Sequence, residues 1–408
     1  MIIWLLALVL FGCLGYAGFA MGAIRAAASL LGLLVAALLA TSLGHVFYPL
    51  FSAVGVKNPL LLWLLGPLLA FLAVLAVFKI IGHVVHRKVD VYYKYKAGDL
   101  RMGLFNRLNA RLGIGVGVAN AAVYLILISW VVYVLSYATT QIAAGDTSPW
   151  TVKLLNNAGE SVESSGMAKV TAAVDRMPGT YYQAADILGL IYHNDLLEAR
   201  LSRYPAFLAL AERQEFQDIG NDKEFTELRQ KQPPIGEILN HPKAQTIINN
   251  PDLLREIWTT TTPHLTDLEA FLKSGQSAEY DGEKILGRWD FDLNGALNAV
   301  KRGKPNIGVL EMQRAKLAMS LSFAKTTLVV APGTEKLAVM KDYGKLKAAA
   351  KPNTPPTVET QSFKGSWSGD AGKYELSFPD KGGNLQAVVD GDRLTVSGDT
   401  FPLVFARE

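Results

Sequence analysis

The sequence predicts a multi-pass α-helical membrane protein with four transmembrane helices, followed by a soluble α+β region. That region comprises a small helical bundle and then an antiparallel β-barrel or a strongly bent sheet. Half of the 408 residues are hydrophobic, and Arg25 is the only charged residue among the first 56. Toward the end of the chain, short strand-like segments alternate with glycine-bearing turns, a pattern typical of antiparallel sheets.

The charge is divided unevenly along the chain. Residues 1–145 carry ten Lys or Arg and two Asp, whereas residues 146–408 carry 30 basic and 34 acidic residues. The front is therefore apolar and basic, and the rear has the composition of an ordinary globular protein. The net charge of +4 comes from one basic segment, so it does not indicate binding to nucleic acid. Cys13 is the only cysteine, which excludes a disulfide framework and a Cys-based metal site.

The apolar front of the chain is long enough for four membrane crossings. A single helix over residues 1–56 would be about 84 Å long at 1.5 Å per residue, whereas a bilayer core is about 30 Å thick. Two crossings fit, with Arg25 at the turn, because an arginine at the bilayer centre costs roughly 2.5–3.5 kcal/mol. Within a membrane domain over 1–140, we expect spans at 2–22, 27–46, 59–83 and 113–138.

Basic residues indicate how these spans are oriented. Segment 86–111 carries seven Lys or Arg and two Asp, and basic residues in short loops stay in the cytoplasm. With four spans, the turn at Arg25 lies on that same side, so both termini are expected to be extracytoplasmic, and in a Gram-negative cell the rear region would be periplasmic. The basic segment can serve only to orient the protein in the membrane, or it can also contact anionic lipid. The residues expected to make this contact are Arg87, Lys88, Lys94, Lys96 and Arg101.

Two pairs of glycines predict close helix packing in the membrane. Gly18 and Gly22 are four residues apart, as are Gly113 and Gly117. Small residues at this spacing let helix backbones approach closely. We expect them to pack helices within the bundle, and a dimer face that would make a homo-oligomer is the alternative.

Two short blocks in the membrane region share their spacing with a known family. The first block comprises Gly22, Arg25, Ser29, Leu30 and Gly32, and the second comprises Asn109, Leu112, Gly113, Gly117, Asn120 and Ala121. In these blocks the chain resembles the colicin V production protein (CvpA) family of bacterial inner-membrane proteins. Asn109 and Asn120 stand where the family usually has Asp and Arg, and Ala26 stands where an acid often follows the first arginine. A charge-dependent activity of the family would be altered by these departures.

The resemblance covers about the first 140 residues and implies a role rather than a chemistry. It implies a multi-pass inner-membrane protein linked to toxin production or export and to envelope homeostasis. The family offers no catalytic mechanism to carry over, and this sequence contains no G-x-S-x-G, P-loop, dinucleotide-binding or H-E-x-x-H motif.

The region over 141–280 is predicted to be helical. Apolar residues recur there at helical spacing, and segment 210–229 is weakly similar to segment 238–257. Each copy is expected to form two short helices broken at "GNDK" or "NNPD", where Asn, Asp and Pro favour turns. An ordinary helical bundle and a peptide-binding groove both fit this pattern.

The region over 281–408 is predicted to be β-rich. Strands are expected at 285–292, 326–331, 335–340, 362–368, 373–378, 385–389, 393–397 and 402–407, with one helix at 294–323 and a Pro-rich linker at 350–361. Eight short strands are enough for a small antiparallel barrel. "GRW" and "GSW" are similar to the Gly-x-Trp opening of lipocalin-type barrels, and Trp289 and Trp367 are expected in the core.

Two functions fit these predictions. The first is a non-enzymatic envelope protein, whose membrane anchor holds a periplasmic module that binds another protein or a lipid-like ligand. The second is a component of an oligomeric channel or transporter gated by the soluble domain. We expect the bilayer and proteins of the envelope or a secretion system as partners, and neither a metal nor a cofactor.

Overall fold

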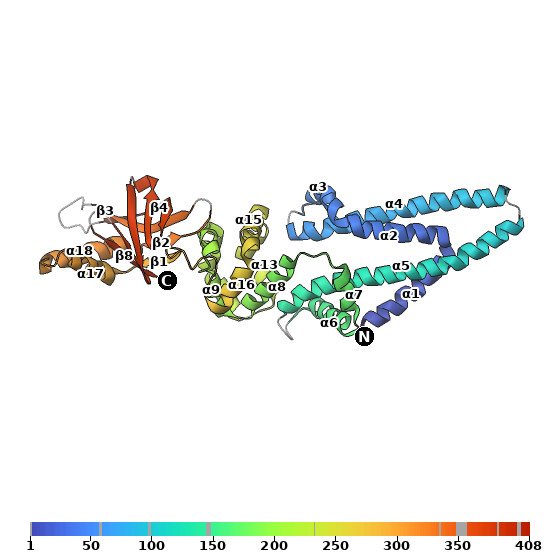
Figure 1. Ribbon diagram of the computed structural model, residues 1–408, viewed down its shortest axis with the longest axis horizontal. Coiled ribbons are helices and arrows are strands. Elements are labelled where there is room, and N and C mark those ends of the chain that lie inside the picture. Colours follow the sequence, from blue (N-terminus) through green and yellow to red (C-terminus); the bar gives the residue numbers. More distant parts are fainter. Residues whose placement is uncertain are drawn as a thin grey trace. The chain divides into compact units, whose positions relative to one another are not determined.

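The computed structural model gathers the chain into two compact units (Figure 1). Unit 1 comprises Met1–His193 and Glu224–Arg255, and unit 2 comprises Asn194–Lys223 and Glu256–Glu408. The structure describes residues 2–56, 59–96, 99–143, 148–231, 233–333, 336–347, 357–381, 383–397 and 401–408.

The front of unit 1 is a bundle of long apolar helices. They are α1 (Ile2–Met21), α2 (Ala23–Gly44), the short η1 (His45–Phe47) and α3 (Tyr48–Ala53), α4 (Pro59–Lys96) and α5 (Asp99–Gln141). Within the described residues, four helical stretches are long and apolar enough to cross a membrane: Ile2–Met21, Ala23–Ala53, Leu61–Lys96 and Leu100–Gln141. The predicted membrane region with four spans is confirmed.

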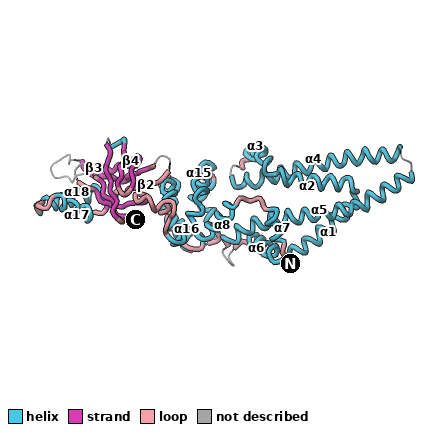
Figure 2. The backbone as a smooth tube through the Cα atoms, viewed as in Figure 1, coloured by secondary structure: helices cyan, strands magenta, loops and turns pink. Residues whose placement is uncertain are grey.

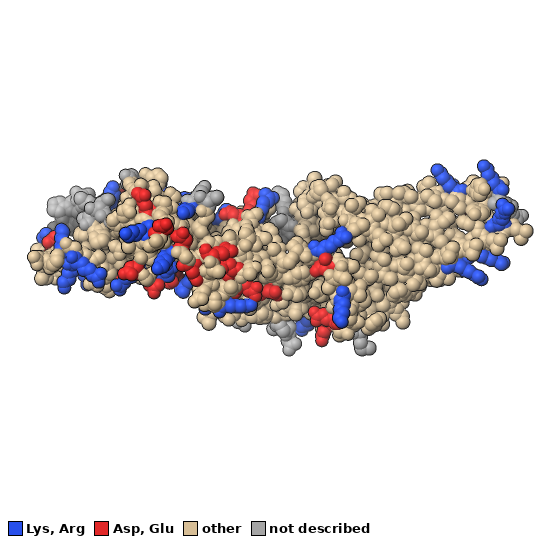
Figure 3. Space-filling model, viewed as in Figure 1, with Lys and Arg blue, Asp and Glu red and all other residues tan. Residues whose placement is uncertain are grey.

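The last two helices are longer than the predicted spans 59–83 and 113–138. Both continue through the basic segment, because Lys, Arg and Leu are good helix formers and extend a helix beyond the bilayer. Figure 3 shows blue side chains at the tip of this bundle and an almost uncharged surface along its length. Within the bundle, α2 packs against α4 and α1 packs against α5.

Three further helices of unit 1 follow α5 and pack against it. They are α6 (Trp150–Ser164), α7 (Met167–Val174) and α8 (Gly179–Tyr192), and we call them the collar. Backbone–side-chain contacts tie the collar to α1 as well, since the Ile3 N–H donates to Ser161 Oγ at 3.2 Å. Unit 1 also contains α13 (Ile235–Asn240), α14 (Pro242–Ile248), most of α12 (Lys223–Gln230) and the start of α15 (Pro251–Thr261), up to Arg255.

The short helices of the predicted helical region form as expected. Copy 210–229 holds α11 (Gln214–Gly220) and α12, and copy 238–257 holds α14 and α15. Unit 2 adds α9 (Asp195–Leu201), η3 (Pro205–Phe207), α10 (Leu208–Ala211), η4 (Thr262–His264) and α16 (Leu265–Ser274).

Unit 2 ends in a closed antiparallel β-barrel, as Figure 2 shows in magenta. Its strands among the described residues are β1 (Gly287–Phe291), β2 (Thr327–Val330), β3 (Leu337–Lys347), β4 (Thr357–Asp370), β5 (Lys373–Phe378), β6 (Gly383–Asp390), β7 (Arg393–Val396) and β8 (Leu403–Arg407), with the short η5 (Pro379–Lys381) between β5 and β6. Each strand pairs with its neighbour in sequence, and β1 closes the barrel by pairing with β8, Phe291 lying opposite Phe405. The predicted barrel is confirmed.

The barrel interior is filled by side chains that alternate along the strands. On β5, for example, Tyr374, Leu376 and Phe378 are buried while their neighbours are partly or fully exposed, as a period of two requires. Trp289 and Trp367 belong to this core, as expected, and their indole N–H groups donate to Ile285 O at 2.8 Å and Ala331 O at 3.0 Å.

Two predictions in this region were wrong in detail. The helix predicted at 294–323 is two helices, α17 (Leu293–Gly303) and α18 (Val309–Phe323), because Gly303, Pro305 and Gly308 interrupt the helical segment. The linker predicted at 350–361 ends earlier, because residues 357–361 pair with β3 as the start of β4. Residues 350–356 lie outside the described residues.

Candidate functional site

The break between α1 and α2 is a single residue, Gly22. Its φ of 83° lies in the left-handed region that glycine adopts without strain. A Cβ there would lie 2.1 Å from Asn109 Nδ2. The break therefore requires glycine both for its backbone conformation and for the close approach of α5.

Two asparagines of α5 bind the start of α2. The first N–H groups of a helix have no partner within it, and the Ile24 N–H donates to Asn109 Oδ1 at 3.3 Å. Eleven residues later on α5, Asn120 Nδ2 donates to the Ala26 carbonyl oxygen at 3.0 Å. Eleven residues make about three helical turns, so Asn109 and Asn120 lie on the same face of α5. We call this site the Gly22 junction.

The predicted packing glycines lie beside the junction. A Cβ on Gly18 would lie 2.1 Å from the Gly113 carbonyl oxygen, and a Cβ on Gly117 would lie 2.2 Å from the Leu14 carbonyl oxygen. Real Cβ atoms do not approach this closely, so α1 and α5 pack backbone to backbone. The structure thus brings Gly18, Gly22, Gly113 and Gly117 together within one chain.

A fourth helix, α4, approaches the junction beside Arg25, which lies in the first turn of α2. A Cβ on Gly82 of α4 would lie 2.6 Å from Ala28 Cβ and 3.7 Å from Arg25 Cα. Arg25 Nε and His86 Nδ1 are buried atoms with no hydrogen-bond partner among the described residues. The sequence did not predict that Gly82 and His86 lie beside Arg25, because its only signal was a small residue one helical turn before a polar one.

The remaining residues that carry the resemblance contact different helices. Gly32 lies against α4, since its Cβ would be 2.5 Å from Phe78 Cβ, and Ser29 is half-buried one turn beyond Arg25. The first block therefore contacts α5 at its beginning and α4 at its end. The second block, Asn109 to Asn120, faces α1 and the start of α2.

The five predicted lipid-contacting residues are all exposed near the ends of α4 and α5: Arg87, Lys88, Lys94, Lys96 and Arg101. Tyr93 of α4 stacks on Phe105 of α5, with ring centroids 4.4 Å apart and an interplanar angle of 10°. This contact holds the two helices together beyond the apolar part of the bundle. The arrangement gathers several exposed cations, as contact with a leaflet containing anionic lipids would require.

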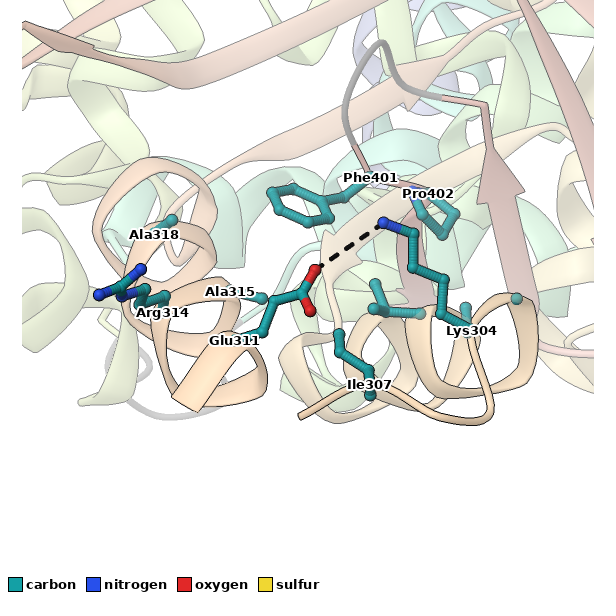
Figure 4. Close-up of a pocket in the computed structure, with 11 residues that line it drawn as sticks. Lys304, Ile307, Glu311, Arg314, Ala315, Ala318, Phe401 and Pro402 are labelled. Atoms are coloured by element: carbon teal, nitrogen blue, oxygen red, sulfur yellow. Dashed lines mark ion pairs between the residues drawn. The ribbon is translucent and has the colours of Figure 1, made fainter. Parts of the chain in front are cut away.

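A groove on unit 2 is a second candidate for binding (Figure 4). It has a volume of about 440 Å³ and lies between α17, α18 and the two residues that precede β8. Its lining residues are Ala299, Val300, Gly303, Lys304, Ile307, Glu311, Arg314, Ala315, Ala318, Phe401 and Pro402. Lys304 Nζ lies 3.9 Å from Glu311 Oε1, and both side chains are exposed, whereas Arg314 points away from this pair (Figure 4). Such a volume falls within the range of small-molecule sites.

These two sites differ in what they can do. The Gly22 junction joins three helices through amide hydrogen bonds and close backbone contacts, so it fixes helix positions. The groove offers apolar walls and the exposed Lys304–Glu311 ion pair, so it can hold an apolar chain that ends in a polar group. Among the described residues, no group of three or more His, Cys, Asp or Glu side chains is arranged to hold a metal ion. Comparison with protein-family models, with curated proteins and with solved structures finds no match for this chain.

Proposed function

We propose that this chain is a non-enzymatic anchor of the bacterial inner membrane that holds an extracytoplasmic binding module. The observation that carries the proposal is the course of α5. This helix runs without interruption from the basic end, past the Gly22 junction and through the apolar bundle to Gln141, where its last turns bind the collar. Tyr137 OH and Gln141 Nε2 both donate to Asp186 Oδ1, at 2.8 and 3.0 Å.

We further propose that the membrane region is of the colicin V production type and serves toxin production or export, or envelope homeostasis. The residues of the resemblance support this, because the two blocks lie 77 or more positions apart in sequence and meet at the Gly22 junction through Ile24–Asn109 and Ala26–Asn120.

The module's groove is proposed to bind a single-chain amphiphile with an anionic head. Ile307, Ala318 and Phe401 supply apolar walls for the chain. Lys304 supplies a cation for the head, because its exposed pairing with Glu311 at 3.9 Å is the weak kind of ion pair that an incoming carboxylate can replace.

A photoreactive fatty acid tests this binding on the full chain in lipid nanodiscs. Adducts mapped by peptide mass spectrometry are expected on the segments around Ile307 and Phe401. Ala318→Phe fills the groove and should reduce these adducts, whereas Leu317→Phe, at an exposed neighbour outside the lining, should leave them unchanged. Adducts confined to the membrane helices, or equal labelling by the methyl ester of the probe, would contradict the proposal.

Topology is tested separately with reporter fusions. A reporter fused after Asp99 should be active in the cytoplasm, and one fused after Asp146 should be active in the periplasm, because basic residues stay inside. A cytoplasmic signal from the second fusion would overturn the placement of the module.

One observation supports an oligomeric channel component as a second candidate. Asn120 Oδ1 and Ser129 Oγ are buried atoms of α5 that lack a hydrogen-bond partner among the described residues. Unpaired polar atoms in a membrane bundle are costly, and a water-filled path would satisfy them. This candidate predicts a conductance in reconstituted vesicles that rises more steeply than linearly with protein concentration. Loss of that conductance in Asn120→Leu would favour the candidate.

A further inference from the structure

The collar helix α7 presents two valines that remain exposed among the described residues. Met167 and Ala168 pack into the cluster formed by Ile3, Ala7 and Val162, and Thr171 is buried. Next to this buried side, Val170 and Val174 are 40% and 44% exposed. Residues four apart share one face of a helix, so the two valines form a stripe.

The length of α1 and its contact with α6 indicate how deep α7 lies in the membrane. The 20 residues of α1 span about 30 Å, which matches the apolar thickness of a bilayer. Its Gly22 end lies beside Asn109 and the charged start of α2, so its Ile2 end reaches the opposite surface of the hydrocarbon core. Ile3 is bound there to Ser161 of α6, immediately before the turn into α7.

Tryptophan and tyrosine side chains with polar groups lie beside the end of α7. Trp130 Nε1 donates to Asp175 Oδ1 at 2.9 Å, and Tyr182 OH donates to Asp175 Oδ2 at 2.5 Å. Tyr181 OH donates to the Val134 carbonyl oxygen at 2.7 Å. Trp and Tyr are enriched where membrane meets water, and Asp175 directly follows α7, so the helix lies at that boundary.

The neighbouring surface and the flanking charges indicate what covers the stripe. Trp4, Leu5 and Leu8 of α1 are exposed and face lipid if α1 crosses the membrane. The exposed residues Lys169 and Arg176 flank the two valines, and cations at such positions reach the phosphates of lipid headgroups. We propose that α7 lies in the headgroup–acyl boundary of the bilayer, with Val170 and Val174 among the acyl chains.

This placement gives the collar a direct contact with lipid, in addition to its contacts with the membrane helices α1 and α5. Apolar burial of two valines and two flanking cations is a modest interfacial anchor. The lipid surface therefore orients the collar about α5, through the contact of Asp175 with Trp130. The inference does not depend on which side of the membrane the collar occupies, nor on what the groove of unit 2 binds.

The single cysteine makes a depth measurement direct. In a Cys13→Ala background reconstituted in phosphatidylcholine–phosphatidylglycerol vesicles, Val170→Cys carries a bimane label. Phosphatidylcholines with a nitroxide at the headgroup, high on the acyl chain or deep in it serve as quenchers, and iodide reports exposure to water. We expect strong quenching by the headgroup and shallow nitroxides, weaker quenching by the deep one, and little by iodide.

Two controls calibrate the scale. Cys13 of the unmodified chain is exposed near the middle of α1, so its label should be quenched most by the deep nitroxide. Val388→Cys, at an exposed valine of β6, should be quenched by iodide and by no lipid. Iodide quenching of Val170→Cys equal to that of Val388→Cys would overturn the proposal. Protection from iodide and from every lipid nitroxide would overturn it too, because a second protein copy would then cover α7.

Discussion

Gly18 and Gly113 touch through their backbones, and a Cβ on Gly18 would lie 2.1 Å from the Gly113 carbonyl oxygen. This contact lies one helical turn from Gly22, where α1 ends. The close approach of α1 and α5 therefore brings Asn109 within reach of the first N–H groups of α2. A packing contact between two glycines thus positions a hydrogen bond in the Gly22 junction.

Gly18→Ala should destabilise the membrane bundle by about 1–3 kcal/mol, because the added methyl group must push α1 away from α5. Gly12→Ala is the matched control on the same helix, since a Cβ there meets nothing within 4 Å. The difference in stability between the two variants is measured by thermal unfolding in detergent, with the fraction of monodisperse protein as the readout. Equal stability of the two variants would show that the helices separate without cost.

Asn109→Ala should cost about 0.5–2 kcal/mol, the usual effect of removing a side chain that caps a helix N-terminus. Asn109→Asp should retain most of the stability, because a carboxylate oxygen also accepts from the Ile24 N–H and is favoured near the start of a helix. The same thermal assay applies. If the Asp variant unfolds as readily as the Ala variant, the hydrogen bond does not stabilise the junction.

Arg407 and Arg393 offer a matched pair in the barrel. The Arg407 guanidinium donates to the carbonyl oxygens of Leu286 at 2.8 Å and Lys284 at 2.5 Å, and its Cζ lies 4.3 Å from the Trp289 ring centroid. Arg407→Ala should cost about 1.5–3 kcal/mol. Arg393 is exposed and lies 3.9 Å from Asp292 Oδ2, so Arg393→Ala should cost less than about 1 kcal/mol.

Hydrogen exchange measured by mass spectrometry distinguishes these two arginine variants within the full chain. Faster exchange is expected in β1 and β8 of Arg407→Ala, because the guanidinium ties the segment before β1 to the end of β8. Arg393→Ala should exchange as the unmodified chain does. The same exchange in both variants would contradict the role assigned to Arg407.

Asp267 should make unit 2 sensitive to acid. Burial alone would raise the pKa of this carboxyl, but hydrogen bonds from Ser277, Tyr204 and the backbone N–H groups of Glu279 and Ala278 outweigh burial and lower it. A lowered folded-state pKa stabilises the protein above the unfolded value of about 3.9. This stability is lost as the pH falls below that value and through the folded-state pKa.

Asp267→Asn should therefore be less stable than the unmodified chain at pH 7, by about 1–3 kcal/mol, and the difference should shrink below about pH 4. Urea unfolding of the full chain at a series of pH values measures it. Asp390→Asn, at an exposed carboxylate of β6, is the control and should change little. A difference between Asp267→Asn and the unmodified chain that is independent of pH would contradict this account.

Much of the fold could be predicted from local sequence signals. Long apolar segments without charged residues predicted the membrane spans, because a charge buried in lipid is costly. Glycine-bearing turns between strand-like segments predicted the barrel. The α17–α18 break was missed, although Gly303, Pro305 and Gly308 mark it. The residues of the Gly22 junction were identified by resemblance, but Gly82 and His86 of α4 were not, since neither has a local signal of contact with Arg25.

The sequence by itself determined where the chain meets lipid and where it alternates as strands, since both depend on the period and length of apolar residues along the chain. Tertiary structure decided which residues meet. Trp130 binds Asp175 across 45 positions, and Asn120 binds the Ala26 carbonyl oxygen across 94. Such contacts depend on the crossing of helices distant in sequence, and a local pattern carries no information about which distant helix will be the partner.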